Sequence, residues 1–172
     1  ICMKGYYNMD LTSPRTIRNI QEQFGFTFKK GLGQNFLTAR NILEEIVDAA
    51  EIESGVIEVG PGFGVLTSEL AQNSDKVVTI EIDERLIDVL DYTLAEYDNV
   101  KIINEDILKL DLKKVIDDEF NGEKVSIAAN LPYYITTPII TKLLEEKLPI
   151  KNIVVMVQKE VAERMSAKPS TK

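Results

Sequence analysis

The tetrapeptide Asn130-Leu131-Pro132-Tyr133 follows the apolar run 125–129 and carries groups that suit chemistry on an exocyclic base amine. Such a nitrogen is a poor nucleophile because its lone pair is delocalised into the purine ring. The Asn130 side-chain carbonyl and the Leu131 backbone carbonyl can each accept one N–H bond, which aims the lone pair at an electrophile. Pro132 fixes the turn without offering an N–H, and Tyr133 offers a face for base stacking. The alternative is an ordinary Asn-Pro turn at a strand end.

A glycine-rich turn, Gly60-Pro61-Gly62-Phe63-Gly64, follows the short apolar stretch 56–59 and precedes a helical pattern. Glycine lets the backbone turn tightly and approach a ligand closely. The spacing differs from the dinucleotide fingerprint, whose glycines hold a pyrophosphate on a helix N-terminus. We therefore expect Gly60 and Gly62 to lie against a ligand without phosphates.

Acidic residues follow the next two apolar runs. Glu81 comes 21 positions after Gly60, where a ribose-binding carboxylate belongs in a βαβ nucleotide site. Asp106 is expected to accept a hydrogen bond from the amino group of an adenine ring, with Ile82 and Ile107 on the two faces of that ring. The alternative for Asp106 is a turn former or a helix cap.

Glu58 interrupts an otherwise apolar strand, where an unpaired buried carboxylate is costly. Two interpretations stay open. The carboxylate orients the ammonium group of an S-adenosylmethionine ligand, or it accepts hydrogen bonds from backbone amides of the glycine-rich turn.

Strand and helix patterns alternate along the chain, which predicts an α/β protein with a mainly parallel sheet and right-handed crossovers. Ligands of such sheets bind at the carboxyl ends of the strands, where Gly60, Glu81, Asp106 and Asn130 all fall. Caps are predicted at Ser13, Thr38 and Thr137. Strands are predicted near 56–59, 77–82, 100–104, 125–129 and 152–157, and helices near 64–73, 84–97, 111–119, 137–147 and 158–167. Two earlier helices are predicted, one from Ser13-Pro14 to near Gly25 and one capped by Thr38 with Leu43, Ile46 and Val47 on one face.

Five segments in order resemble the N-terminal catalytic domain of the small-subunit ribosomal RNA adenine N6,N6-dimethyltransferase family: 30–37 (KGLGQNFL), 58–64 (EVGPGFG), 81–83 (EID), 130–138 (NLPYYITTP) and 157–165 (VQKEVAERM). The resemblance implies a Rossmann-like methyltransferase fold. It also implies transfer of methyl groups from S-adenosylmethionine to N6 of two adjacent adenosines near the 3′ end of small-subunit ribosomal RNA. Cofactor contacts are implied at Asn35, Leu37, Gly60, Glu81, Asp106 and Asn130. The resemblance also implies that the protein is a cytoplasmic monomer whose partner is the pre-30S particle.

The chain departs from this family at its end. Family members continue with two more strands and a helical RNA-binding domain, so we expect residues 9–172 to be a truncated catalytic domain of weak activity or none. Residues 1–8 are expected to be a foreign or disordered leader.

The amino-acid composition excludes several kinds of catalytic and metal site. The chain of 172 residues has no histidine and one cysteine, Cys2, which excludes a Ser-His-Asp triad, a disulfide framework and a thiolate zinc site. We expect no metal and no membrane span, since the run 153–157 is far shorter than the ~20 apolar residues that a span needs. The net charge is −8, but residues 1–40 and 151–172 are both net positive, so the chain ends are better placed than the middle to meet RNA.

Three other functions compete with this interpretation. The resistance-type large-subunit ribosomal RNA methyltransferases resemble the chain less around Gly60 and in the segment 158–160. A nicotinamide dehydrogenase would need its third glycine one position later and has no use for the 130–133 turn. A non-catalytic RNA-binding assembly factor would use the same fold as a scaffold.

Overall fold

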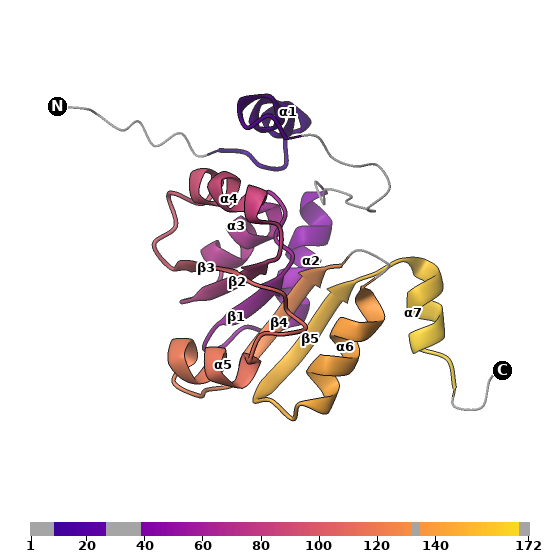
Figure 1. The fold of residues 1–172 in the computed structure, drawn as a ribbon. Coiled ribbons are helices and arrows are strands. Elements are labelled where there is room, and N and C mark those ends of the chain that lie inside the picture. Colours follow the sequence, from indigo (N-terminus) through magenta and orange to yellow (C-terminus); the bar gives the residue numbers. More distant parts are fainter. Residues whose placement is uncertain (1–8, 27–38, 132–134, 169–172) are drawn as a thin grey trace.

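In a computed structural model of the chain, five parallel strands form one sheet with helices on both faces (Figure 1). The structure describes residues 9–26, 39–131 and 135–168. The strands are β1 (Val56–Val59), β2 (Val77–Glu81), β3 (Val100–Asn104), β4 (Val125–Asn130) and β5 (Ile150–Met156). The helices are α1 (Pro14–Gln23), α2 (Arg40–Ala50), α3 (Val65–Gln72), the 3-10 helix η2 (Glu84–Leu86), α4 (Ile87–Thr93), α5 (Leu112–Phe120), α6 (Thr136–Glu145) and α7 (Lys159–Met165).

The strand order is β3-β2-β1-β4-β5. The chain builds the sheet outward from β1 to β3, then returns through α5 to place β4 on the other side of β1. Val59 therefore pairs with Ile80 of β2 on one side and with Ala129 of β4 on the other. This reversal is the point in open α/β sheets where ligands bind, just beyond the carboxyl ends of the central strands.

Alternate residues of the strands feed two hydrophobic cores, as the two-residue period of a strand requires. Val56 and Val77 point to the face covered by α1 to α4, whereas Ile57 and Val78 point to the face covered by α5 and α6. All four residues of β1 and all five of β2 are buried, so both strands are central and completely covered. The mainly apolar character of these strands follows from burial on both faces.

Most predicted element boundaries agree with the structure to within two residues. The single helix predicted over 84–97 is wrong. The Leu86 N–H donates to the Asp83 carbonyl at 2.9 Å, which closes a tighter 3-10 turn, and the Asp83 side chain caps it by accepting from the Arg85 N–H. The α-helix that follows, α4, ends at Thr93.

The predicted helix caps agree with the structure less often than the predicted helix and strand boundaries do. Ser13 is the residue before α1, with Pro14 at the first helical position, but the Ser13 side chain makes no capping bond. The cap predicted at Thr137 is wrong, because the αR backbone of Ile135 starts α6 at Thr136. Ala39 is the residue before α2, and the cap predicted at Thr38 lies outside the described residues.

Within the described ranges, none of the helices is both long and apolar enough to cross a membrane.

Candidate functional site

Four predicted site residues meet at the carboxyl edge of the sheet. Glu81 ends β2 and pairs with Asn104, the last residue of β3, two positions before Asp106. Gly60 follows β1, and its N–H donates to the Ile80 carbonyl at 3.0 Å. Asn130 ends β4 on the other side of β1, so the central strands bring Gly60, Glu81 and Asn130 together.

The glycine-rich turn faces open space. Gly60 and Gly62 have φ of +73° and +59°, in the left-handed region that side chains disfavour. Among the described residues, a Cβ built on either glycine would meet no atom within 4 Å. Phe63, the residue after Gly62, is fully buried and anchors the turn to the core. The backbone is thus held firmly beside a space that a ligand can enter.

Glu81 presents a carboxylate beside this space. Its side chain is held by the Asp83 backbone N–H, which donates to Oε1 at 2.9 Å. Burial raises the pKa of the Glu81 carboxyl, while the N–H groups of Asp83 and Gly62 favour the charged form. The next residue, Ile82, is 64% exposed, which is unusual for a large apolar side chain at a strand end. A carboxylate acceptor and an uncovered apolar side chain are therefore neighbours at the end of β2.

Asp106 forms the turn that the alternative interpretation predicted. Its Oδ1 accepts from the Leu108 N–H at 3.0 Å, and Oδ2 lies 3.6 Å from Lys109 Nζ. Ile107 is 6% exposed and packs into the core under α5 and α6. The roles of Asp106, Ile82 and Ile107 around an adenine ring stay predictions.

The segment after β4 is only partly described. Asn130 lies opposite Met156 of β5, and the Leu131 N–H donates to the Met156 carbonyl at 3.4 Å. This contact continues the sheet one residue past β4 and fixes the chain where the Leu131 carbonyl is expected to act. Pro132 and Tyr133 lie outside the described residues, as do Asn35 and Leu37.

Glu58 is fully buried, and its partner is a residue that the sequence analysis missed. Its Oε2 accepts from the Thr67 hydroxyl of α3 at 2.5 Å, so the carboxyl is bonded to a helix side chain and not to amides of the turn. Thr79 lies opposite on β2, with a buried hydroxyl that has no hydrogen bond in the described part of the chain. Its hydroxyl nevertheless lies near enough to the Glu58 carboxyl to lower the pKa of that group. Burial raises the pKa of Glu58 to about 8, against the opposing influence of both threonines.

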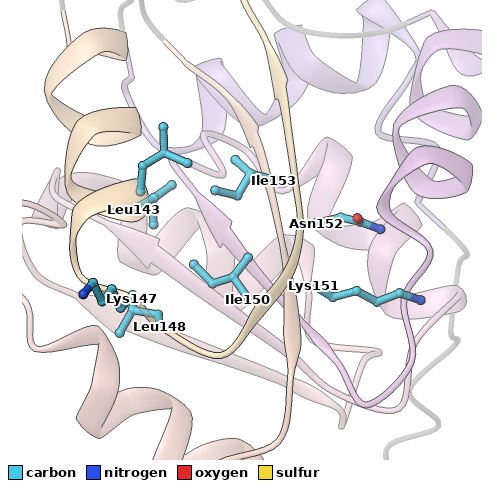
Figure 2. Close-up of a pocket in the computed structure, with 8 residues that line it drawn as sticks. Leu143, Lys147, Leu148, Ile150, Lys151, Asn152 and Ile153 are labelled. Carbon is cyan, nitrogen blue, oxygen red and sulfur yellow. The ribbon is translucent and has the colours of Figure 1, made fainter.

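A separate depression of about 430 Å³ lies far from these residues, between the end of α6 and the start of β5 (Figure 2). Figure 2 shows Leu143, Ile150 and Ile153 together at its centre, with the amino groups of Lys147 and Lys151 directed outward. It contains none of the predicted site residues and lies at the opposite end of β5 from Met156. The depression therefore gives no reason to move the predicted site away from the carboxyl edge of the sheet. Among the described residues, no group of three or more acidic, cysteine or histidine side chains could hold a metal ion.

Comparison with known proteins identifies the family of this chain. Residues 25–172 match the ribosomal RNA adenine dimethylase family. The chain belongs to this family. A ribosomal RNA small subunit methyltransferase A from Bacillus mycoides (strain KBAB4) is 57% identical over 166 residues, which cover 95% of this chain and 57% of that protein. The same figures hold for the protein of that name from Bacillus cereus (strain B4264).

Two solved structures support the fold of this adenine dimethylase family member. The 23S rRNA methyltransferase ErmE is 32% identical with a TM-score of 0.65, over 75% of this chain and 50% of that one. A dimethyladenosine transferase from Plasmodium falciparum is 37% identical with a TM-score of 0.62, over 74% of this chain and 45% of that one. The Rossmann-like fold and the family resemblance are therefore confirmed. The chain spans just over half the length of its Bacillus relatives.

Proposed function

We propose that this chain binds S-adenosylmethionine at the carboxyl ends of β1, β2 and β3, and presents it to an adenosine held at the end of β4. The reaction is methyl transfer to N6 of two adjacent adenosines near the 3′ end of small-subunit ribosomal RNA. The observation that carries this proposal is the open space before Gly60 and Gly62, bounded by the Glu81 carboxylate and adjoining Asn130.

The cofactor's parts match the residues around this space. Its ribose hydroxyls would donate to Glu81, which burial and two backbone N–H groups keep in place. Its adenine would cover the exposed side chain of Ile82, with Asp106 and Ile107 at the ring. Its methionine part would lie along Gly60 and Gly62, where no side chain of the described ranges intrudes. Further contacts are proposed at Asn35 and Leu37.

The target amine would be aligned by the residues after β4. The Asn130 side-chain carbonyl and the Leu131 carbonyl would each accept one N–H, and Tyr133 after Pro132 would stack on the base. The sulfonium of the bound cofactor supplies the methyl group and a good leaving group. Alignment therefore matters more than a strong base, which suits a chain without histidine.

Small-subunit RNA is favoured over large-subunit RNA as the substrate. The small subunit methyltransferase A relatives are 57% identical to this chain, whereas the 23S enzyme ErmE is 32% identical. We accordingly propose the pre-30S particle as the partner, a monomeric state and a cytoplasmic location.

Calorimetric titration tests the cofactor site. The chain should bind S-adenosylmethionine and not NAD. Glu81→Ala should weaken this binding roughly ten- to 150-fold, the equivalent of ~1.5–3 kcal/mol for hydrogen bonds to a charged group. Glu123→Ala, which removes an exposed carboxylate from the α5–β4 turn, is the matched control and should bind like the parent. An unchanged dissociation constant in a folded Glu81→Ala variant would refute the assignment.

A methylation assay separates an enzyme from an assembly factor. A version extended to the length of the Bacillus relatives should transfer labelled methyl groups to small-subunit RNA in pre-30S particles. Binding of particles without transfer would instead favour the non-catalytic alternative.

A further inference from the structure

An interaction chain starts at the Glu81 carboxylate and leads away from the open space. The backbone N–H that holds Glu81 Oε1 belongs to Asp83. The Asp83 carboxylate is in turn clamped by Arg85: Nε donates to Oδ1 at 2.8 Å, Nη2 donates to Oδ2, and the Arg85 backbone N–H donates to Oδ1 at 3.1 Å. Three donors from one residue thus fix the loop that orients Glu81.

The same arginine connects this loop to the segment after α1. Its guanidinium carbon lies 5.1 Å from the centre of the Phe26 ring, in a cation–π arrangement. Phe26 is 9% exposed and meets Phe63 edge-on, with ring centres 5.5 Å apart. Phe63 is the buried residue of the glycine-rich turn, next to Gly62, whose N–H also favours the charged form of Glu81. The contacts therefore close a ring that begins and ends at the cofactor site.

We propose that Arg85 is a positioning residue for cofactor binding, which acts through Asp83 on Glu81 and is itself seated by Phe26. This inference rests on the proposed ribose-binding role of Glu81. An Arg85 side chain that is 64% exposed gives little stability through an ion pair alone. Its effect is instead on geometry, since a rotated 81–85 loop withdraws the Asp83 N–H and turns the carboxylate away from the ribose hydroxyls. Docking of the segment after α1 and cofactor affinity are consequently linked.

The test measures S-adenosylmethionine affinity by calorimetry and the thermal midpoint in parallel. Arg85→Ala should raise the dissociation constant about three- to tenfold, the loss expected when one charged hydrogen bond is weakened. Arg85→Lys, which keeps the charge without the two-pronged geometry, should recover only part of the affinity. Phe26→Leu, which keeps an apolar side chain but removes the ring, should shift affinity in the same direction as Arg85→Ala. The control is Arg40→Ala, because Arg40 makes a comparably exposed ion pair with Asp10, away from the 81–85 loop.

A double-mutant cycle distinguishes positioning from simple anchoring of α1. If Arg85 acts through Glu81, adding Arg85→Ala to Glu81→Ala should cause no further loss of affinity. A purely structural role predicts a lower thermal midpoint with unchanged affinity, which would overturn the proposal. An equal loss in the Glu81→Ala background, or the same loss in Arg40→Ala, would also overturn it. Failure of the parent chain to bind S-adenosylmethionine would instead refute the proposed function itself.

Discussion

Replacing Glu58 by glutamine should abolish a pH dependence of stability that this one carboxyl produces. Burial raises the native pKa to about 8 from the ordinary value of 4.5, so the native protein keeps a proton that the unfolded chain releases. Stability from this group is complete below pH 4.5 and is lost as the pH rises toward 8. The difference of one proton corresponds to ~1.4 kcal/mol per pH unit, or about 2.5 kcal/mol between pH 5.5 and 7.5.

Glutamine fits the same surroundings without a titrating group. Its carbonyl can accept from the Thr67 hydroxyl as Glu58 does, and its amide can donate to the buried Thr79 hydroxyl, which has no hydrogen bond among the described residues. Glu58→Gln should therefore be more stable than the parent at pH 7.5 and close to it at pH 5.5. The pKa of Glu81 is shifted in the same direction, so the quantity to compare is the difference between the parent and the variant.

Urea unfolding at pH 5.5, 6.5 and 7.5 provides the measurement, with exposed Glu123→Gln as the control. Parallel stability profiles for the parent and Glu58→Gln would show that the buried carboxyl is not a neutral acid in the native state. Titration of Glu58→Gln with S-adenosylmethionine tests the other interpretation of Glu58, in which its carboxylate orients the ammonium group of the cofactor. Because Glu58 is enclosed by Thr67 and Thr79, we expect affinity to stay within about twofold, whereas a contact with the cofactor's ammonium would cost ~1.5–3 kcal/mol.

Three further changes probe other parts of the molecule. Gly62→Ala should cost about 1 kcal/mol of stability through its positive φ, but lower S-adenosylmethionine affinity tenfold or more, since its methyl enters the open space; calorimetry showing only a stability loss would contradict this. Glu119→Gln should destabilise the protein by about 1 kcal/mol at pH 7. Lys101 and Lys76 lower the pKa of Glu119, so urea unfolding should show this difference shrinking as the pH falls below 4.5; a difference that persists there would exclude the ion pairs as its source. In a version extended to the length of the Bacillus relatives, Asn130→Ala should reduce single-turnover methylation far more than cofactor affinity, and an unaffected rate would refute the amine-aligning role.

The sequence was sufficient for the sheet and for the positions of the main site residues. Strand and helix periodicities are local, so they predicted five parallel strands and placed Gly60, Glu81, Asp106 and Asn130 at one edge. The contacts that hold these side chains are not local. Thr67 reaches Glu58 only because α3 folds back over β1, and Arg85 lies on Phe26 across 59 positions of sequence. The cap predicted at Thr137 failed for a related reason, since the actual start of α6 depends on the backbone at Ile135.

The strand order also governs when a nascent chain can acquire its ligand. β1 pairs with β2 nearby in sequence, but its other edge pairs with β4, where Val59 meets Ala129 after 70 intervening steps of chain. Until residue 130 has been synthesised and has left the ribosome, β1 presents an unpaired apolar edge. The ligand site still lacks Asn130 during this time. Cofactor binding therefore cannot guide the folding of the first half of the domain. It can only stabilise a sheet that has already formed completely. The interval before β4 inserts is therefore when the growing chain is most exposed to edge-to-edge aggregation.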